Sequence, residues 1–283
     1  MLLRQVEYAR PASVDEAVRL LAQNDGARPL AGGQTLVNVM KQRAASPDVL
    51  VDLADLAELR AIGFGDDGRL ELGAMVTLTR LIDSSEVDVA RPVLAEVGRT
   101  VADVQVRNRG TIGGNVCVND PTNHFPPLLV ALGATMTVRG AGGEREVPAE
   151  EFFLGVYVTA VGEGELLTKI SVPPGGHGVG DGFAGVAVGA HGTYIVDAAA
   201  TVADGTVRVA LGCVAGAPVR PTAMEERLSG GDLSDEAVGA AARGIGASLD
   251  PPSDVHASAD YRRHLAEVSA VRAVQQAARR AKG

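Results

Sequence analysis

The chain has 283 residues, 46% of them hydrophobic and 22% charged, with a formal net charge of −9. These ordinary globular proportions exclude global disorder, and an acidic chain without a basic stripe is not expected to bind nucleic acid. Because there is no run of 18 apolar residues and the start MLLRQVEYAR has no signal-peptide core, we expect a cytoplasmic protein without a membrane span. Cys117 and Cys213 are isolated cysteines in apolar surroundings, so we expect both thiols to be buried. They form no C-x-x-C pair and the histidines have no metal-site spacing, so we expect no metal site.

The first 57 residues predict alternating strands and helices. Ser13 and Glu16 form a capping-box pattern at the start of an apolar stripe, which predicts a helix over residues 13–24. A strand is expected from Ala27 to Ala31, a helix after the glycines that follow it, and another strand over Val49–Leu53. This β–α–β–α–β order predicts a small, mostly parallel sheet.

Residues 58–177 have a different pattern, which mixes antiparallel strands with helices. The stretch from Gly63 to Gly68 matches G-x-G-x-x-G, but an alternating segment follows it where a dinucleotide motif needs a helix, so it predicts a hairpin. The remaining elements are expected in this order: helix over 81–104, helix over 126–134, hairpin over 135–147 and strand over 166–173.

The stretch PPGGHGVGDG, residues 173–182, has the composition of a linker. Three strands and then helices over Thr222–Leu228, Asp235–Ile245 and Ser258–Ala278 are expected after it. The sequence therefore predicts an α+β protein with parts 1–57, 58–177 and 178–283, the last with a three-stranded antiparallel sheet.

Two glycine-rich stretches are the candidate ligand-binding loops. Gly32-Gly33-Gln34-Thr35-Leu36 follows a predicted strand and opens a predicted helix, where main-chain N–H groups favour an anion; a plain β–α turn explains it equally well. Thr111-Ile-Gly-Gly-Asn115 is interpreted as a second loop, flanked by Arg107 and Arg109, which could neutralise phosphate or a partner carboxylate; a simple connection with solvated arginines is the alternative.

Two such loops in one acidic chain favour a dinucleotide ligand. No G-x-S-x-G motif and no nucleophile–base pair can be identified, so any chemistry is left to a cofactor.

Four stretches in this order resemble the FAD-binding medium subunit of the molybdenum hydroxylases, the family of xanthine dehydrogenase and carbon monoxide dehydrogenase. They are PLAGGQTL (29–36), VRNRGTIGGN (106–115), LLTKISVP (166–173) and ASADYRRHLAEVSAVRA (257–273). The resemblance covers essentially the whole chain. It implies a two-subdomain FAD-binding fold of the PCMH type, followed by a small C-terminal flavoprotein domain.

The resemblance also implies which residues contact FAD. The first loop, which wraps the diphosphate, comprises Pro29, Leu30, Ala31, Gly32, Gly33, Gln34, Thr35 and Leu36. The second loop supplies Thr111, Gly113, Gly114 and Asn115, while Leu167 and Tyr194 correspond to positions near the flavin ring. His124 stands where relatives often have aspartate, and Gly185 and Thr193 also depart from the common residues, which affects the flavin contacts and the electron acceptor.

The function implied is that of an FAD-carrying electron-transfer subunit. Its partners would be a molybdenum-cofactor large subunit and a [2Fe–2S] small subunit, assembled as a dimer of heterotrimers. The alternatives are a stand-alone FAD-dependent oxidase, which would need a base near the flavin, and a scaffold that uses the fold without flavin.

Overall fold

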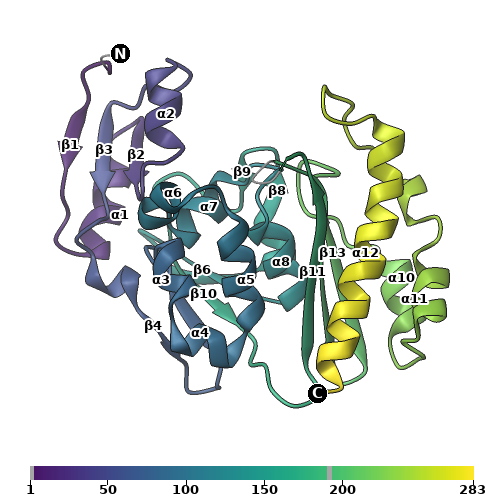
Figure 1. Ribbon diagram of the computed structural model, residues 1–283. Helices are drawn as coiled ribbons and strands as arrows, with labels where there is room; N and C mark the ends of the chain where they lie inside the picture. The colour runs from purple at the N-terminus through teal and green to yellow at the C-terminus, as the bar shows by residue number, and fades with distance from the viewer. Residues whose placement is uncertain (1–2, 190–192) are drawn as a thin grey trace.

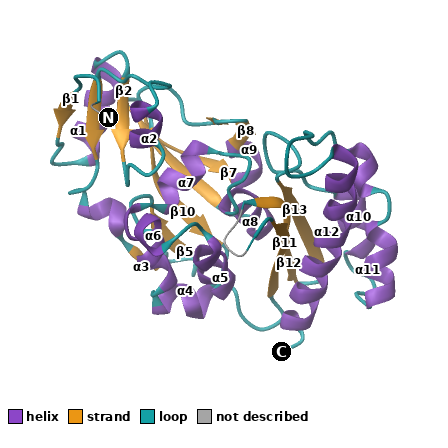
Figure 2. Ribbon diagram, turned by 45° about the horizontal axis from the view of Figure 1, so that its top comes forward, coloured by secondary structure: helices purple, strands orange, loops and turns teal. Residues whose placement is uncertain are grey.

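Three β-sheets succeed one another along the molecule, in the order in which the chain forms them (Figure 1). A computed structural model describes residues 3–189 and 193–283. The N-terminal sheet has three strands, the central sheet has five and the C-terminal sheet has three, with a separate two-stranded hairpin beside the central sheet. Helices pack around each sheet, as the colouring of Figure 2 shows. The predicted α+β class is confirmed.

The N-terminal sheet is parallel throughout, with strand order β1-β3-β2, as its alternating pattern predicts. Its elements are β1 (Glu7–Ala9), α1 (Val14–Gln23), β2 (Ala27–Leu30), α2 (Leu36–Lys41) and β3 (Val49–Asp52). The Ser13 hydroxyl accepts from the N–H of Glu16 and caps α1, while the Glu16 carboxylate accepts from the N–H of Ala12. One apolar side of α1, including Val14 and Val18, packs on the sheet.

The central sheet is antiparallel, with strand order β4-β5-β10-β6-β7. Its strands are β4 (Ile62–Phe64), β5 (Leu70–Gly73), β6 (Thr135–Gly140), β7 (Gly143–Pro148) and β10 (Leu166–Val172). The helices around it are η1 (Ala57–Arg60), α3 (Leu78–Ile82), α4 (Ser85–Ala90), α5 (Pro92–Thr100), α6 (Val104–Arg109), α7 (Ile112–Val118), α8 (Phe125–Leu132) and α9 (Ala149–Phe152). The hairpin consists of β8 (Phe153–Gly155) and β9 (Val158–Thr159). The predicted hairpin at Gly63–Gly68 is confirmed as β4–β5.

The C-terminal sheet, β11-β12-β13, is antiparallel, which confirms the prediction. Its strands are β11 (Gly180–Ala187), β12 (Tyr194–Ala203) and β13 (Thr206–Gly212). The helices of this part are α10 (Thr222–Leu228), α11 (Asp235–Ala242), η2 (Ile245–Ser248) and α12 (Ala259–Ala281). The long helix α12 lies along the sheet, with α11 packed on its outer side (Figure 1).

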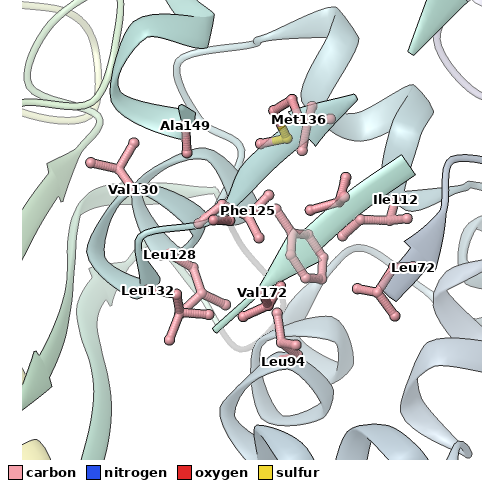
Figure 3. Packing of buried hydrophobic residues seen from close by; sticks show 14 of the residues in the cluster. Leu72, Leu94, Ile112, Phe125, Leu128, Val130, Leu132, Met136, Ala149 and Val172 are labelled. Carbon is pink, nitrogen blue, oxygen red and sulfur yellow. The ribbon is translucent and has the colours of Figure 1, made fainter. Parts of the chain in front are cut away.

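Helix α8 joins the central part to the C-terminal sheet. All eight of its residues are buried, because β12 and β13 cover the side that does not face the central core. Figure 3 shows Phe125 among Leu72, Leu94, Ile112 and Val172, which come from four other elements. The same core cluster includes Ala199 and Ala210 of the C-terminal sheet. One continuous apolar core therefore fixes the C-terminal sheet against the central part.

The expectation of a loop over residues 111–115 is wrong. Asp103 and Thr111 each cap a helix with a side-chain oxygen, so the chain here forms α6 and the start of α7. Glycine has poor helix propensity, but buried contacts of Ile112 and Val116 outweigh this preference. No helix within residues 3–189 and 193–283 is long and apolar enough to cross a membrane.

Candidate functional site

A cavity of about 500 Å³ opens between the loop after β2 and the central part of the molecule. Twelve of the fifteen predicted site residues line it: Pro29, Ala31, Gly32, Gly33, Gln34, Thr35, Leu36, Thr111, Gly113, Gly114, Asn115 and Leu167. The structure thus brings together two stretches that lie some 80 positions apart in the sequence. Leu30, His124 and Tyr194 are not among the lining residues.

The loop after β2 presents unused main-chain donors to this cavity. Among the described residues, the main-chain N–H groups of Gly33, Gln34 and Thr35 donate no hydrogen bond. Gly33 has φ +74°, a left-handed conformation that glycine adopts without cost. Thr35 is the N-cap of α2, but its side chain forms no capping bond. Consecutive free N–H groups before a helix bind anionic oxygens, as the sequence predicts for this loop.

The second glycine stretch differs from this loop because its amides are already used. The N–H of Ile112 donates to the carbonyl of Val76, and that of Gly113 donates to the carbonyl of Ala74, both at 2.9 Å. The N–H of Gly114 donates to the Thr111 hydroxyl at 3.0 Å. The glycines therefore let α7 pack closely on the central sheet, and this corrects the expectation that their amides are free for a ligand.

The polar group that this stretch does offer is the side chain of Asn115. Its Oδ1 atom is buried without a hydrogen-bond partner among the described residues, and Asn115 lines the cavity. Asn123 donates from Nδ2 to the Asn115 carbonyl at 2.9 Å and fixes this edge. A buried oxygen without a donor costs free energy, so a ligand that carries hydroxyl or N–H groups fits here.

The remaining wall of the cavity is largely apolar. Leu166 and Leu167 enter from β10, at a point where its pairing with β6 is shifted by a bulge. Val101 and Ala102 contribute from the turn after α5, and Cys117 from α7. Burial raises the pKa of the Cys117 thiol to about 12. Such a wall suits a planar aromatic ring system and supplies no reactive thiolate.

His124 and Tyr194 lie together beside the cavity: neither lines it, but His124 directly follows the lining residue Asn123. His124 Nδ1 and Asp197 Oδ2 are 2.7 Å apart, and Asp197 is fully buried. The ring centroids of His124 and Tyr194 are 4.3 Å apart, and Phe183 lies 5.9 Å from the imidazole. Gly185 is also close to Tyr194, since a β-carbon there would lie 2.5 Å from the tyrosine ring. This cluster joins α8 to the C-terminal sheet.

The two arginines that flank the glycines have separate positions. Arg107 donates from Nη1 to the carbonyls of Val101 and Ala102, both at 2.9 Å, and so holds the turn on the cavity wall. Arg109 lines a second cavity, which shares Thr111 with the first. Arg107 therefore binds main-chain carbonyls of its own protein, and among the described residues its guanidinium pairs with no carboxylate.

Sequence reasoning missed most of the cavity wall. The lining residues that it did not identify are Arg28, Asn38, Leu53, Ala74, Met75, Leu78, Val101, Ala102, Val106, Gly110, Cys117, Val118, Asn123 and Leu166. Most are apolar residues with no local signature, and only the tertiary fold places them together. Four had a signal: Asn123 lies in the polar turn DPTN before α8, while Val106, Gly110 and Leu166 lie within the stretches that carry the family resemblance.

Taken together, the free amides, the unpartnered Asn115 oxygen and the apolar wall define a protein that binds a nucleotide-type cofactor. Residues 4–175 match the family described as FAD binding domain in molybdopterin dehydrogenase, and residues 180–277 match the CO dehydrogenase flavoprotein C-terminal domain. The chain belongs to the FAD-binding medium subunits of the molybdenum hydroxylase family, and it is thus a subunit of an FAD-dependent oxidoreductase.

Individual relatives match over their full length. The carbon monoxide dehydrogenase medium chain of Afipia carboxidovorans is 37% identical, with 100% of both chains covered. The nicotine 6-hydroxylase medium subunit of Paenarthrobacter nicotinovorans is 35% identical, with 94% of this chain and 95% of the relative covered. Among solved structures, carbon monoxide dehydrogenase from Hydrogenophaga pseudoflava matches with a TM-score of 0.94 at 38% identity, over 99% of each chain.

Proposed function

We propose that this chain transfers electrons from the [2Fe–2S] clusters of a partner subunit to an external acceptor. FAD, when bound, supplies the redox chemistry by accepting and releasing the electrons. The names of the relatives support this proposal, because they are medium chains or medium subunits of a dehydrogenase and a hydroxylase. The chain's own residues bind and orient the cofactor.

The free N–H groups of Gly33, Gln34 and Thr35 would donate to the diphosphate oxygens of FAD. All three residues line the cavity just before α2, and Arg28 is the only charged residue among the described ones that line it. Asn115 Oδ1 would accept from a hydroxyl or N–H group of the cofactor. Leu166 and Leu167 would contact one face of a ring and exclude water from it. His124 and Tyr194 remain proposed flavin neighbours on the family resemblance, and His124 directly follows Asn123, which lines the cavity.

The observation that carries this proposal is the absence of acid–base groups from the cavity. Among the described residues that line it, Arg28 is the only charged one, and there is no histidine, carboxylate, lysine, serine or tyrosine. A stand-alone oxidase needs a base close to the flavin to take a proton from its substrate. A subunit that only passes electrons needs none, which favours electron transfer over the oxidase alternative.

The proposed assembly contains a molybdenum-cofactor large subunit and a [2Fe–2S] small subunit, arranged as a dimer of heterotrimers in the cytoplasm. Within the described residues, no group of histidine, cysteine or carboxylate side chains could hold a metal ion, so the clusters would be held by another chain. We also propose domain limits at 1–57, 58–177 and 178–283, because the buried apolar residues form three clusters, each centred on one sheet although two of them include residues of a neighbouring part.

Two measurements test the proposal. FAD-loaded chain should show no oxidase turnover alone, and its flavin absorbance should bleach on anaerobic mixing with the dithionite-reduced cluster-bearing subunit from the same complex. Flavin that stays oxidised in that mixture would contradict electron transfer. For the site, Gly114→Val should prevent FAD retention, since a β-carbon there lies only 3.0 Å from the Thr111 hydroxyl and the larger side chain reaches the cavity.

The matched control for the site is Gly63→Val. Gly63 lies in β4 with no atom within 4 Å of an added β-carbon, so this variant should retain FAD. Stoichiometric FAD in both variants, after gel filtration, would show that the cofactor does not lie against Gly114.

A further inference from the structure

A second cavity, of about 310 Å³, adjoins the cofactor cavity. Ala31, Gly32, Met75 and Thr111 line both cavities and therefore form the boundary between them. The other lining residues of the second cavity are Ala54, Arg60, Thr77, Arg80, Asn108 and Arg109. They come from η1, the start of α3 and the end of α6, so three separate segments of the chain build this cavity.

Three arginines, Arg60, Arg80 and Arg109, give this cavity a concentrated positive charge, although the chain as a whole carries −9. No carboxylate is among the described residues that line it. Within residues 3–189 and 193–283, the guanidinium groups of Arg80 and Arg109 form neither an ion pair nor a hydrogen bond. Arg60 donates from Nη2 to the Ala54 carbonyl, which is a neutral acceptor.

Arg80 influences one acid outside the cavity, Glu86, whose carboxylate is already hydrogen-bonded to serine hydroxyls. The pKa of the Glu86 carboxyl is lowered first by its own main-chain N–H, then by the hydroxyls of Ser84 and Ser85, and last by the charge of Arg80. The Ser84 hydroxyl donates to Glu86 Oε2 at 2.8 Å. The three arginines thus share a cavity that no described carboxylate lines, and the one acid that Arg80 influences lies outside it.

Uncharged donors accompany the arginines. Asn108 Oδ1 accepts from the Thr79 hydroxyl at 2.7 Å, which fixes the amide so that its N–H₂ group stays available. The Thr77 oxygen accepts from the N–H of Arg80 at 3.2 Å, and its own hydroxyl proton has no acceptor among the described residues. The polar groups of the cavity are therefore dominated by donors, which is the composition of an anion site.

We propose that this cavity binds the phosphoryl group of a phosphorylated small molecule, at a site separate from that of FAD. A phosphate monoester carries about −1.5 to −2 charges and three acceptor oxygens, which matches several guanidinium donors. A single carboxylate offers two oxygens and one charge, and would leave two of the three arginines unbalanced. Arginine also binds phosphate bidentately, so two or three arginines fix its orientation.

The boundary between the cavities keeps the two sites apart. A β-carbon at Gly32 would lie 1.9 Å from the main-chain oxygen of Arg109, so these two segments are in direct contact. Arg109 lines only the second cavity, whereas Gly33, Gln34 and Thr35 line only the first. A bound phosphoryl group would therefore not displace FAD.

The test uses the FAD-loaded full chain and inorganic phosphate as the probe, titrated by calorimetry at low ionic strength. We expect one phosphate per chain. Arg80→Gln and Arg109→Gln should each weaken binding by about tenfold or more, because each removes a charged donor. The control Arg272→Gln, an exposed arginine on α12 away from the cavity, should bind phosphate as the wild type does. FAD content should be the same in all three variants.

Three results would overturn the proposal. One is the absence of phosphate binding by the FAD-loaded wild type, or equal binding by all variants. Another is binding by FAD-free chain alone, with displacement by FAD, since phosphate would then occupy the diphosphate position. The third is acetate binding as tight as phosphate binding, because the site would then recognise carboxylates.

Discussion

Gly32 lies so close to Arg109 that a β-carbon at residue 32 would sit 1.9 Å from the Arg109 main-chain oxygen. This contact brings the loop after β2 against the junction of α6 and α7. The Gly32–Arg109 contact therefore limits the distance between the two walls of the cofactor cavity. The next residue, Gly33, favours glycine for a different reason, which is its left-handed backbone conformation with φ +74°.

Replacement of Gly32 by alanine should therefore separate the two sides of the cavity. The clash is with main chain, which cannot rotate away, so we expect a loss of at least about 1–3 kcal/mol in the free energy of unfolding, together with weaker FAD binding. Thermal unfolding and flavin content after gel filtration measure the two effects. Gly63→Ala is the control, because that site is open. Unchanged stability and FAD content in Gly32→Ala would show that the contact is not required.

The pair His124–Asp197 provides a second prediction. Asp197 is fully buried, its Oδ2 is 2.7 Å from His124 Nδ1, and its Oδ1 has no partner among the described residues. His124→Leu leaves this carboxylate buried without its partner, so the free energy of unfolding should fall by about 3–5 kcal/mol. Urea denaturation measures the loss.

The matched control for this pair adds Asp197→Asn to His124→Leu. The double variant removes the buried charge as well as its partner, and most of the lost stability should return. A double variant as unstable as His124→Leu alone would indicate that ring packing against Tyr194, and not the charge, accounts for the effect.

Regular elements could be predicted from the sequence where local patterns agree with the tertiary structure. The parallel N-terminal sheet follows from strands separated by capped helices, and α12 follows from a long amphipathic stretch that begins at Ser258. The β4–β5 hairpin follows from Asp66-Asp67-Gly68, where Gly68 has φ +78°. In each case one segment carries its own signal, and tertiary packing reinforces it.

The helix that begins at Thr111 could not be predicted in the same way. Two glycines in its first turn indicate a loop by propensity, and they are tolerated because Gly113 packs against the Ala74 carbonyl, where a β-carbon would lie 2.5 Å away. The cavity wall is equally hidden from the sequence. Val101, Cys117 and Val118 are ordinary apolar positions until the fold brings them together.

The cofactor cavity makes a last prediction through Cys117. Burial raises the pKa of this thiol to about 12, so only about one thiol in 10⁴ is ionised near pH 8, and iodoacetamide should not modify it in either FAD-loaded or FAD-free chain. Mass spectrometry of the folded chain checks this, with urea-unfolded chain as the positive control. Because this pKa is raised, the neutral Cys117 thiol contributes fully to the free energy of unfolding below about pH 9, and that contribution is lost as the pH rises toward 12. The stability difference between the wild type and Cys117→Ala should change accordingly over this pH range. Rapid alkylation of Cys117 in FAD-free chain near pH 8 would show that the thiol is reactive and only shielded by the cofactor.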